Sequence, residues 1–237
     1  MIMTEYIPKL STEVIESLLV REFSQDEIDA ARRVLNGYSA ESIDGRNRVL
    51  SGMLKLSEGD LVLLEHNVEI AMVDFRDIVA WAESPNLSKD PFHTLSSEDK
   101  SLKTSILRQD YDQYQNWLNR KVSAKSLRKI LKVGLDTSIR GRGISLVQAL
   151  SEVDFDKHKN KVTVDDLRYQ IDLMPEVIDE WFSYSEDKRT SGGWYLLRDL
   201  RIGTLMDQTE ELSFSESDVA VANYVIKELN YWNESRV

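Results

Sequence analysis

The amino-acid sequence predicts a mainly α-helical protein, with a helical N-terminal part and a small α+β C-terminal part that contains a short β-hairpin. Apolar residues recur every three or four positions through residue 118, which is the period of one helix face. A period-two alternation occurs only near Trp194, where the runs "GGWYLL" and "RIGTLM" flank "RDL". Because 41% of the 237 residues are hydrophobic, the chain can bury a sizeable core.

Two short helices and a helical hairpin are expected in the first third of the chain. In "STEVIESLLVREF" either Ser11 or Thr12 can cap an apolar stripe, and in "SQDEIDAARRVLNGY" Ser24 with Glu27 has the spacing of a capping box. A helix over 46–56, a break at 57–60 and a long helix over 60–81 follow, and Pro85 prevents the long helix from running much further. One face of the long helix is expected to be buried; it consists of Leu61, Leu64, Val68, Ala71, Phe75, Ile78 and Ala82.

Helices are also expected over much of the remaining chain. The stretches "SLKTSILRQDYDQYQNWL", "ISLVQALSEVDF" and "TVDDLRYQIDLMPEVIDEWFSYSEDK" have helical spacing. In the third stretch Thr163 and Asp166 can cap a helix, and Pro175 suits a first turn. The hairpin is expected near 193–206, and Ser213 with Glu216 opens the last helix.

The charge is acidic overall but changes sign along the chain. Thirty Lys and Arg residues stand against 41 Asp and Glu residues, a net charge of −11, which argues against a general phosphate-backbone binder and favours a basic partner. Residues 120–143 hold eight cations against the single Asp136, whereas residues 1–119 carry a net charge of −9. We therefore expect a helical domain over 1–119, a basic connecting helix over 120–143 and an α+β domain over 144–237.

Cysteine is absent from the sequence, which excludes disulfides, thiolate metal sites and a Cys nucleophile and favours a cytoplasmic location. The start, "MIMTEYIPKLSTEV", lacks a basic region followed by an apolar run, and eighteen apolar residues stand together nowhere. Secretion by a signal peptide and association with a membrane are therefore not expected.

Residues 48–85, "RVLSGMLKLSEGDLVLLEHNVEIAMVDFRDIVAWAESP", contain a Lys-Leu pair, a Gly-Asp turn and an Asp-aromatic-Arg-Asp core in this order. The segment resembles one found in small uncharacterised bacterial helical proteins. The resemblance implies a helical fold in a bacterial protein. It carries over no activity and no catalytic residue.

The "DFRD" core offers the candidate catalytic residues Asp74, Arg76 and Asp77. Two carboxylates three positions apart can share a helix side, where they could perform acid–base chemistry or hold a divalent cation. A structural ion pair to a neighbouring helix, such as the one bearing Arg46 and Arg48, explains the same residues and is favoured.

The three histidines, His66, His93 and His158, show no HExxH spacing, and ordinary imidazoles are favoured over metal ligands or bases. No metal and no cofactor are expected.

The stretch "KRTSGGWYLL", residues 188–197, combines cations and hydroxyls with a glycine pair and aromatics. Gly192-Gly193 permits a sharp bend, after which Trp194 and Leu196 would point to one sheet face and Tyr195 and Leu197 to the other. The cations beside the bend either form an anion site or are solvated, and the solvated alternative is favoured. The candidate binding residues are Lys188, Arg189, Trp194, Tyr195, Trp181 and Tyr184.

The basic segment could meet an acidic partner or nucleic acid through Lys125, Arg128, Lys129 and Lys132, which lie opposite Leu127, Ile130 and Leu131. It has no interleaved aromatic residue on which bases could stack, so intramolecular or solvated use is favoured and nucleic acid is not expected.

Together these observations favour a cytosolic bacterial protein–protein interaction protein with a basic protein partner. An inhibitor of the immunity or antitoxin type, which covers a basic toxin surface with acidic patches, is the specific hypothesis. Exposed members of the set Trp81, Trp117, Trp181, Tyr184 and Trp232 would supply affinity. The alternatives are a carboxylate-based enzyme that acts on a small polar or phosphorylated substrate, and a regulator that places the basic segment on nucleic acid.

Overall fold

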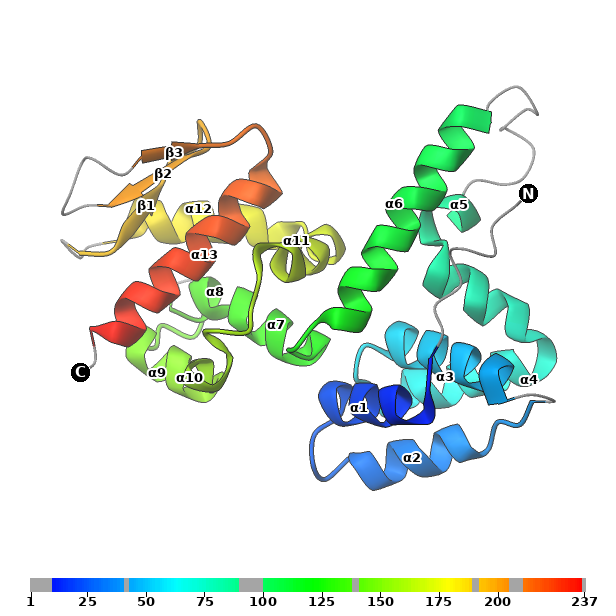
Figure 1. The fold of residues 1–237 in the computed structure, drawn as a ribbon. Coiled ribbons are helices and arrows are strands. Elements are labelled where there is room, and N and C mark those ends of the chain that lie inside the picture. Colours follow the sequence, from blue (N-terminus) through cyan, green and yellow to red (C-terminus); the bar gives the residue numbers. More distant parts are fainter. Residues whose placement is uncertain are drawn as a thin grey trace. The chain divides into compact units, whose positions relative to one another are not determined.

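The computed structural model describes residues 10–40, 43–89, 100–137, 141–188, 192–204 and 211–235. The chain divides into two compact units, Met1–Ser123 (unit 1) and Ala124–Val237 (unit 2). Both are built mainly from helices, and the strands that the structure describes all belong to unit 2 (Figure 1). The predicted fold class, mainly α with a small C-terminal sheet, is confirmed.

Unit 1 consists of α1 (Thr12–Glu22), α2 (Ile28–Asn36), α3 (Ile43–Ser57), α4 (Leu61–Glu83), α5 (Pro85–Lys89) and α6 (Lys100–Asn119). Helices α3 and α4 form the predicted hairpin. Glu58 and Gly59 adopt positive φ in its turn, and the Asp60 carboxylate caps α4 by accepting the Val62 N–H at 2.8 Å. Gly52 lets the two helices approach closely, since a Cβ there would lie 3.0 Å from the Ile78 side chain.

The core of unit 1 is apolar and includes Leu19, Met53, Leu64 and Tyr114, which are almost fully buried. A buried ion-pair cluster lies beside it. Glu22 of α1 pairs with Arg120 at 2.7 Å. Arg21 pairs with Glu22 and donates to the carbonyl of Arg120 at 2.8 Å. The cluster therefore fastens the end of α6 to α1.

Helix α4 is broken, which corrects the expectation of one continuous helix. Asp74 has the non-helical angles φ −151° and ψ 102°, although the sequence from 60 to 84 contains neither Pro nor Gly. One non-helical residue rotates everything that follows it about the helix axis. Phe75 is consequently half exposed instead of buried, whereas Leu64 and Ile78, on either side of the break, are buried as predicted.

Unit 2 contains the helices α7 (Ala124–Leu131), α8 (Val133–Thr137), α9 (Leu146–Glu152), α10 (Phe155–His158), α11 (Val164–Leu173), α12 (Glu176–Asp187) and α13 (Ser217–Glu234). The capping box predicted at the start of α11 is present, with Thr163 and Asp166 exchanging side-chain and backbone hydrogen bonds. Helix α13 is central, because α9, α11, α12 and the sheet all contact it (Figure 1).

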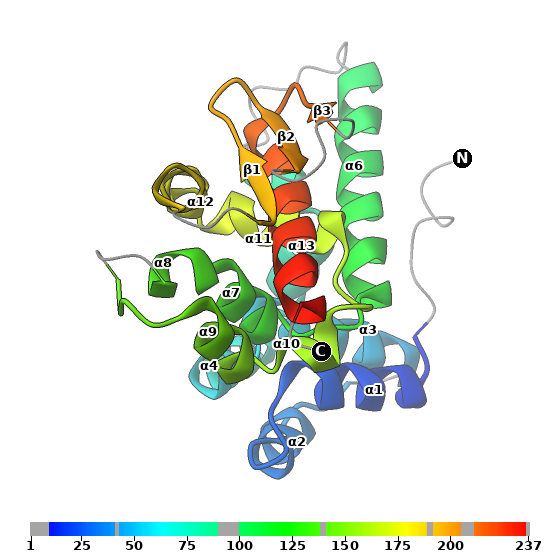
Figure 2. The ribbon, with the colours of Figure 1, turned by 90° about the vertical axis from the view of Figure 1, so that its left-hand side faces the viewer.

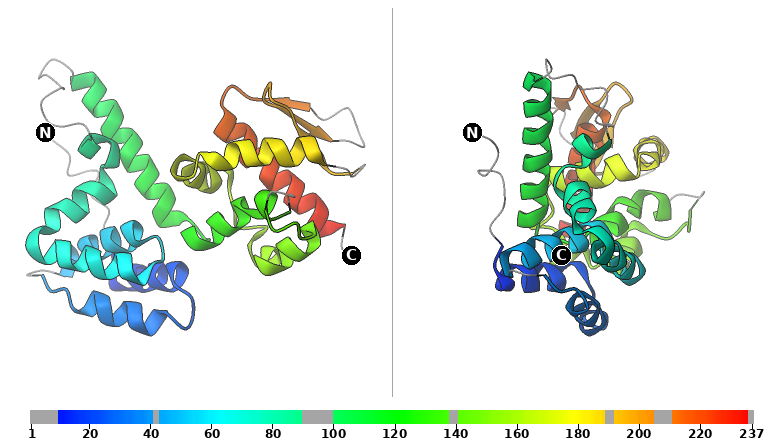
Figure 3. Two further views of the ribbon diagram at one scale, coloured as in Figure 1. Left: turned by 180° about the vertical axis from the view of Figure 1, so that it is seen from behind. Right: turned by 90° about the vertical axis from the view of Figure 1, so that its right-hand side faces the viewer.

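The sheet of unit 2 contains the predicted hairpin and one strand more. Strands β1 (Trp194–Leu196), β2 (Arg201–Thr204) and β3 (Glu211–Ser213) are antiparallel in the order β1-β2-β3. Leu196 pairs with Ile202, which in turn pairs with Leu212. Strand β1 packs against α12 and α13 (Figures 2 and 3). The alternation predicted after the glycine pair is therefore real, with Trp194 and Leu196 on the buried face.

The basic segment is not a connecting helix. Residues 120–123 belong to unit 1, whereas residues 124–137 form α7 and α8, which belong to unit 2 and contact α11 and α12. Leu127, Ile130 and Leu131 are fully buried. The reason is that the apolar residues between the cations form their own stripe at helical spacing, and burial of this stripe makes the segment part of the core.

Candidate functional site

The "DFRD" sequence is the start of the second half of α4. The Asp74 carboxylate accepts the backbone N–H of Arg76 at 2.9 Å and its Nε at 2.8 Å. These two bonds, from the guanidinium first and the backbone second, lower the pKa of Asp74 to about 2. Asp74 is thus a helix N-cap, and Asp77 stands three positions later on the solvent side.

The ion pair expected between this sequence and α3 is not formed by the predicted residues. Arg48 pairs with Glu83, near the end of α4. Arg46 donates to the carbonyls of Leu35 and Tyr38. The break explains the difference, because it turns the Asp74 carboxylate toward the arginine two positions along its own chain.

Apolar side chains lie exposed on both sides of the break. The exposed fraction is 69% for Met72, 90% for Val73 and 50% for Phe75. Three further exposed apolar residues lie on the same helix, and together with these they define the α4 surface: Val62, Leu63, Met72, Val73, Phe75 and Trp81. Of the aromatic residues proposed from sequence as partner contacts, Trp81 is exposed and belongs to this surface.

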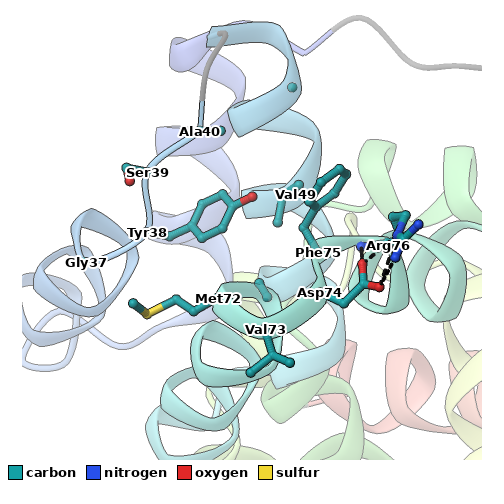
Figure 4. A pocket seen from close by; sticks show the side chains of 12 residues that line it. Gly37, Tyr38, Ser39, Ala40, Val49, Met72, Val73, Asp74, Phe75 and Arg76 are labelled. Carbon is teal, nitrogen blue, oxygen red and sulfur yellow. Dashed lines mark hydrogen bonds and ion pairs between the residues drawn. The ribbon is translucent and has the colours of Figure 1, made fainter.

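A hollow of about 790 Å³ opens beside the break (Figure 4). Its walls are residues 37–40 after α2, Gly45 and Val49 of α3, and residues 71–76 of α4. The Tyr38 ring extends from the loop toward Val49 (Figure 4), and its burial raises the pKa of the phenol. The hollow is therefore mostly apolar, with a few polar groups at its edge, which is the usual make-up of a binding pocket.

The charges around the hollow are negative on balance. The Asp74 and Arg76 side chains offset each other, while Glu69, two positions before the α4 lining residues, and Asp77, directly after them, are exposed carboxylates. Arg46 donates to the carbonyls at the end of α2 and keeps its positive charge. The carboxylates of Glu69, Asp74 and Asp77 thus exceed the guanidinium groups of Arg46 and Arg76 by one.

Lys188, a candidate from the "KRTSGGWYLL" stretch, has a buried side chain and is not a solvated loop cation. Its ammonium lies 2.5 Å from Oε1 of Glu228, whose side chain is fully buried. Burial is the main influence on Lys188 and lowers its pKa. Gly193 supplies the predicted bend with φ 84°, and a Cβ there would lie 2.5 Å from Oε2 of Glu228. Arg189 lies outside the described residues.

Glu228 is the centre of this cluster, and sequence reasoning missed it. Besides the Lys188 ion pair, its carboxylate accepts the Tyr184 hydroxyl at 3.0 Å, the Trp232 indole N–H at 2.8 Å and the Trp194 backbone N–H at 2.7 Å. A signal was available, because Glu228 follows Tyr224 by four positions on the buried face of α13. An acidic residue on an apolar stripe requires buried partners.

The remaining aromatic candidates of unit 2 are mostly structural. Trp181 is fully buried, and its indole N–H donates to the carbonyl of Leu131 at 2.8 Å. Trp194 is buried, with the Lys227 ammonium 4.1 Å from the centre of its ring. Tyr195 reaches the outer face of the sheet, where its hydroxyl donates to Glu211 at 2.9 Å.

The cations of the basic segment divide into internal and surface groups. Arg120 is buried against Glu22 in unit 1. Arg142 pairs with Glu152 at 2.6 Å. Lys129 and Lys132 are exposed on unit 2. The charges of Arg120 and Arg142 are thus balanced within the chain.

A metal-binding cluster of three or more His, Asp or Glu side chains is not found within the described ranges. His66 is exposed, and its Nδ1 lies 3.7 Å from Glu69. His158 is half-buried, and burial lowers its pKa. His93 lies outside the part of the chain that the structure describes.

Comparison with known proteins adds no relative: no protein-family model, curated protein or solved structure matches this chain. Among the residues that the structure describes, no helix combines the length and apolar content needed to cross a lipid bilayer.

Proposed function

We propose that this chain is a protein-interaction protein that binds a basic protein partner through the α4 surface. The exposure of Met72, Val73 and Phe75 on both sides of the helix break is the observation that supports this proposal most directly. Leaving large apolar side chains in water is unfavourable, and grouped exposed apolar residues mark interaction sites. Aromatic residues such as Phe75 and Trp81 are the side chains that most often anchor such interfaces.

The charge of the chain supports a basic partner. The net charge is −11, and the exposed Glu65, Glu69 and Asp77 lie on the same helix as the apolar residues. Carboxylates at the edge of an interface accelerate association with a cationic partner and reject acidic competitors. Apolar contact would then supply the affinity.

The specific form of the proposal is a bacterial, cytoplasmic inhibitor of the immunity or antitoxin type. Such an inhibitor covers a basic surface of its toxin with an acidic one. The acidic charge and the resemblance of residues 48–85 to bacterial helical proteins support this form.

The test compares the wild-type chain with a double variant, Val73→Ser with Phe75→Ser, and with the control variant Val20→Ser. Val20 is an exposed apolar residue of α1, so its replacement removes exposed apolar area from a place outside the α4 surface. Each protein is used to capture partners from an extract of its host at low ionic strength. We expect one basic protein that the wild type and Val20→Ser retain and the double variant releases.

The captured protein is then mixed with the wild-type chain by stopped flow at several salt concentrations. The association rate should fall as the Debye length shrinks from about 30 Å at 0.01 M to about 8 Å at 0.15 M salt, while dissociation changes little. An association rate that does not depend on salt, equal retention by all three proteins, or retention of nucleic acid alone would contradict the proposal.

A further inference from the structure

We propose that the hollow beside Asp74 is the anchor pocket of this interface, and that it receives an aromatic side chain that stands next to a cation on the partner. The inference rests on the proposed function and names the chemistry of the segment that the α4 surface binds. Three properties of the hollow lead to it: its shape, its charge and the way in which the break keeps it open.

The shape suits an aromatic group. The volume of about 790 Å³ lies within the range of about 300–1,000 Å³ that is typical of pockets for small molecules, so the hollow has room for an aromatic side chain together with the residue beside it. Tyr38 and Phe75 contribute aromatic rings and Val49 an aliphatic wall. Aromatic rings that meet edge to face or offset stabilise each other beyond the area they bury.

The charge selects a cation beside the aromatic group. Glu69 stands two positions before the lining residues of α4 and Asp77 directly follows them, and both are exposed. Arg76 is a cation of the lining, and its guanidinium is held by Asp74. His66, which lies 3.7 Å from Glu69, adds positive charge only when it is protonated. Counted with Arg46, which acts electrostatically on Tyr38 of the lining, these groups carry three negative and two positive charges. An ammonium or guanidinium group on the partner would therefore meet a net negative charge.

The helix break keeps the pocket open. In an uninterrupted helix Phe75 would continue the buried stripe of Ala71 and Ile78, since these residues are spaced by four and three positions. Asp74 instead caps the second half of α4 through the Arg76 N–H, which holds Phe75 at the surface. A pocket that exists before binding requires little reorganisation, and this favours affinity.

The experiment uses two small probes with the same aromatic ring and opposite charge. Tryptamine carries an ammonium group and indole-3-propionate a carboxylate. Binding to the full chain is followed by NMR through the methyl signal of Met72, which lines the hollow. We expect tryptamine to shift this signal and to bind about ten times more tightly than indole-3-propionate, which corresponds to about 1.4 kcal/mol. The variant Glu69→Gln with Asp77→Asn should remove most of this preference.

A second experiment fills the hollow with a large side chain. Ala40→Trp and Ser39→Trp each add a large ring from an exposed lining position, and Gln25→Trp adds the same ring at an exposed position outside the lining. Both filled variants should lose tryptamine binding at unchanged thermal stability, and Gln25→Trp should retain it. Tryptamine binding that survives both filled variants, or equal binding of the two probes, would overturn the inference.

The same variants separate this inference from the proposed function. If the captured partner still requires Val73 and Phe75 but binds the filled variants normally, the anchor-pocket inference is refuted and the proposed interface is retained. If no partner depends on Val73 and Phe75, the proposed function itself fails. Tight binding of uncharged aromatic compounds, with no preference for a cation, would identify a small-molecule pocket and would also overturn the inference.

Discussion

Replacement of Glu228 by glutamine keeps the shape of the side chain and removes the negative charge that Lys188 faces. The carboxylate is fully buried, and the Lys188 side chain beside it is almost as well buried. Glutamine can still accept one hydrogen bond from Tyr184 or Trp232, but the Lys188 ammonium then lacks a counter-charge in a buried place. The substitution Lys188→Met is the reciprocal change, because it removes the cation and keeps the carboxylate with its three remaining donors.

The size of the effect follows from burial. Removal of one partner of a buried ion pair costs about 3–5 kcal/mol, because the other charge stays uncompensated. We expect a loss of about 3 kcal/mol for Glu228→Gln, since part of its hydrogen bonding survives, and about 1–3 kcal/mol for Lys188→Met. The double variant should be more stable than Glu228→Gln alone, since removal of both charges leaves neither unpaired.

Urea unfolding of the four proteins measures these free energies, provided that the slope of unfolding free energy against urea concentration is the same in all four. The indole N–H of Trp232, which donates to Glu228 at 2.8 Å, gives a local signal in a nitrogen–proton correlation spectrum. This signal should shift in Glu228→Gln and change less in Lys188→Met. The coupling between the two substitutions should exceed about 1 kcal/mol.

Additive effects of the two substitutions would refute this reasoning. They would mean that Lys188 and Glu228 do not interact in solution. Lys188 would then be the solvated loop cation that the sequence favoured, and the 188–197 stretch would again be open to an anion. A small effect of Glu228→Gln with a large effect of Lys188→Met would refute it as well, because the structure places the greater number of hydrogen bonds on the carboxylate.

Three further outcomes are expected. Burial lowers the pKa of Lys55 to about 8, whereas its pKa in the unfolded chain is about 10.4. Between these pH values the unfolded chain binds more protons than the folded chain. The free energy of unfolding should therefore rise by about 1 kcal/mol per pH unit from pH 8 to 10. Urea titrations should show this rise in the wild type, and its persistence in Lys55→Met would contradict the assignment. Glu22→Gln removes the carboxylate that pairs with Arg21 and Arg120. It should lower the free energy of unfolding by about 3 kcal/mol more than Glu16→Gln, which removes an exposed carboxylate. Equal effects of the two substitutions would show that the buried cluster is not stabilising. Gly134→Val should lower the melting temperature and shift Trp181 fluorescence, because a Cβ at position 134 already lies 3.0 Å from the Trp181 ring; unchanged fluorescence would place the ring elsewhere.

The sequence by itself predicted much of the secondary structure. The helical period, the Thr163–Asp166 capping box and the glycine bend before Trp194 depend on neighbours within a few positions. These interactions are local, so their signals are present in short stretches of sequence. The break in α4 also has a local signal, since Asp74 and Asp77 have the spacing of a helix N-cap and an acidic third position. One continuous helix was nevertheless expected, because the apolar stripe continues through Phe75.

The tertiary structure decided which charged and aromatic residues are buried and which are exposed. Glu228 meets Trp194 across 34 positions of sequence and Tyr184 across 44, and Arg120 meets Glu22 across 98. The spacing of apolar residues shows which face of a helix is apolar. It does not show which other helix will cover that face or which charged side chain will be buried with it. For the same reason the sequence suggested Lys188 and Trp181 as surface contacts, whereas the packed helices of unit 2 bury them and the broken α4 of unit 1 exposes Met72, Val73 and Phe75.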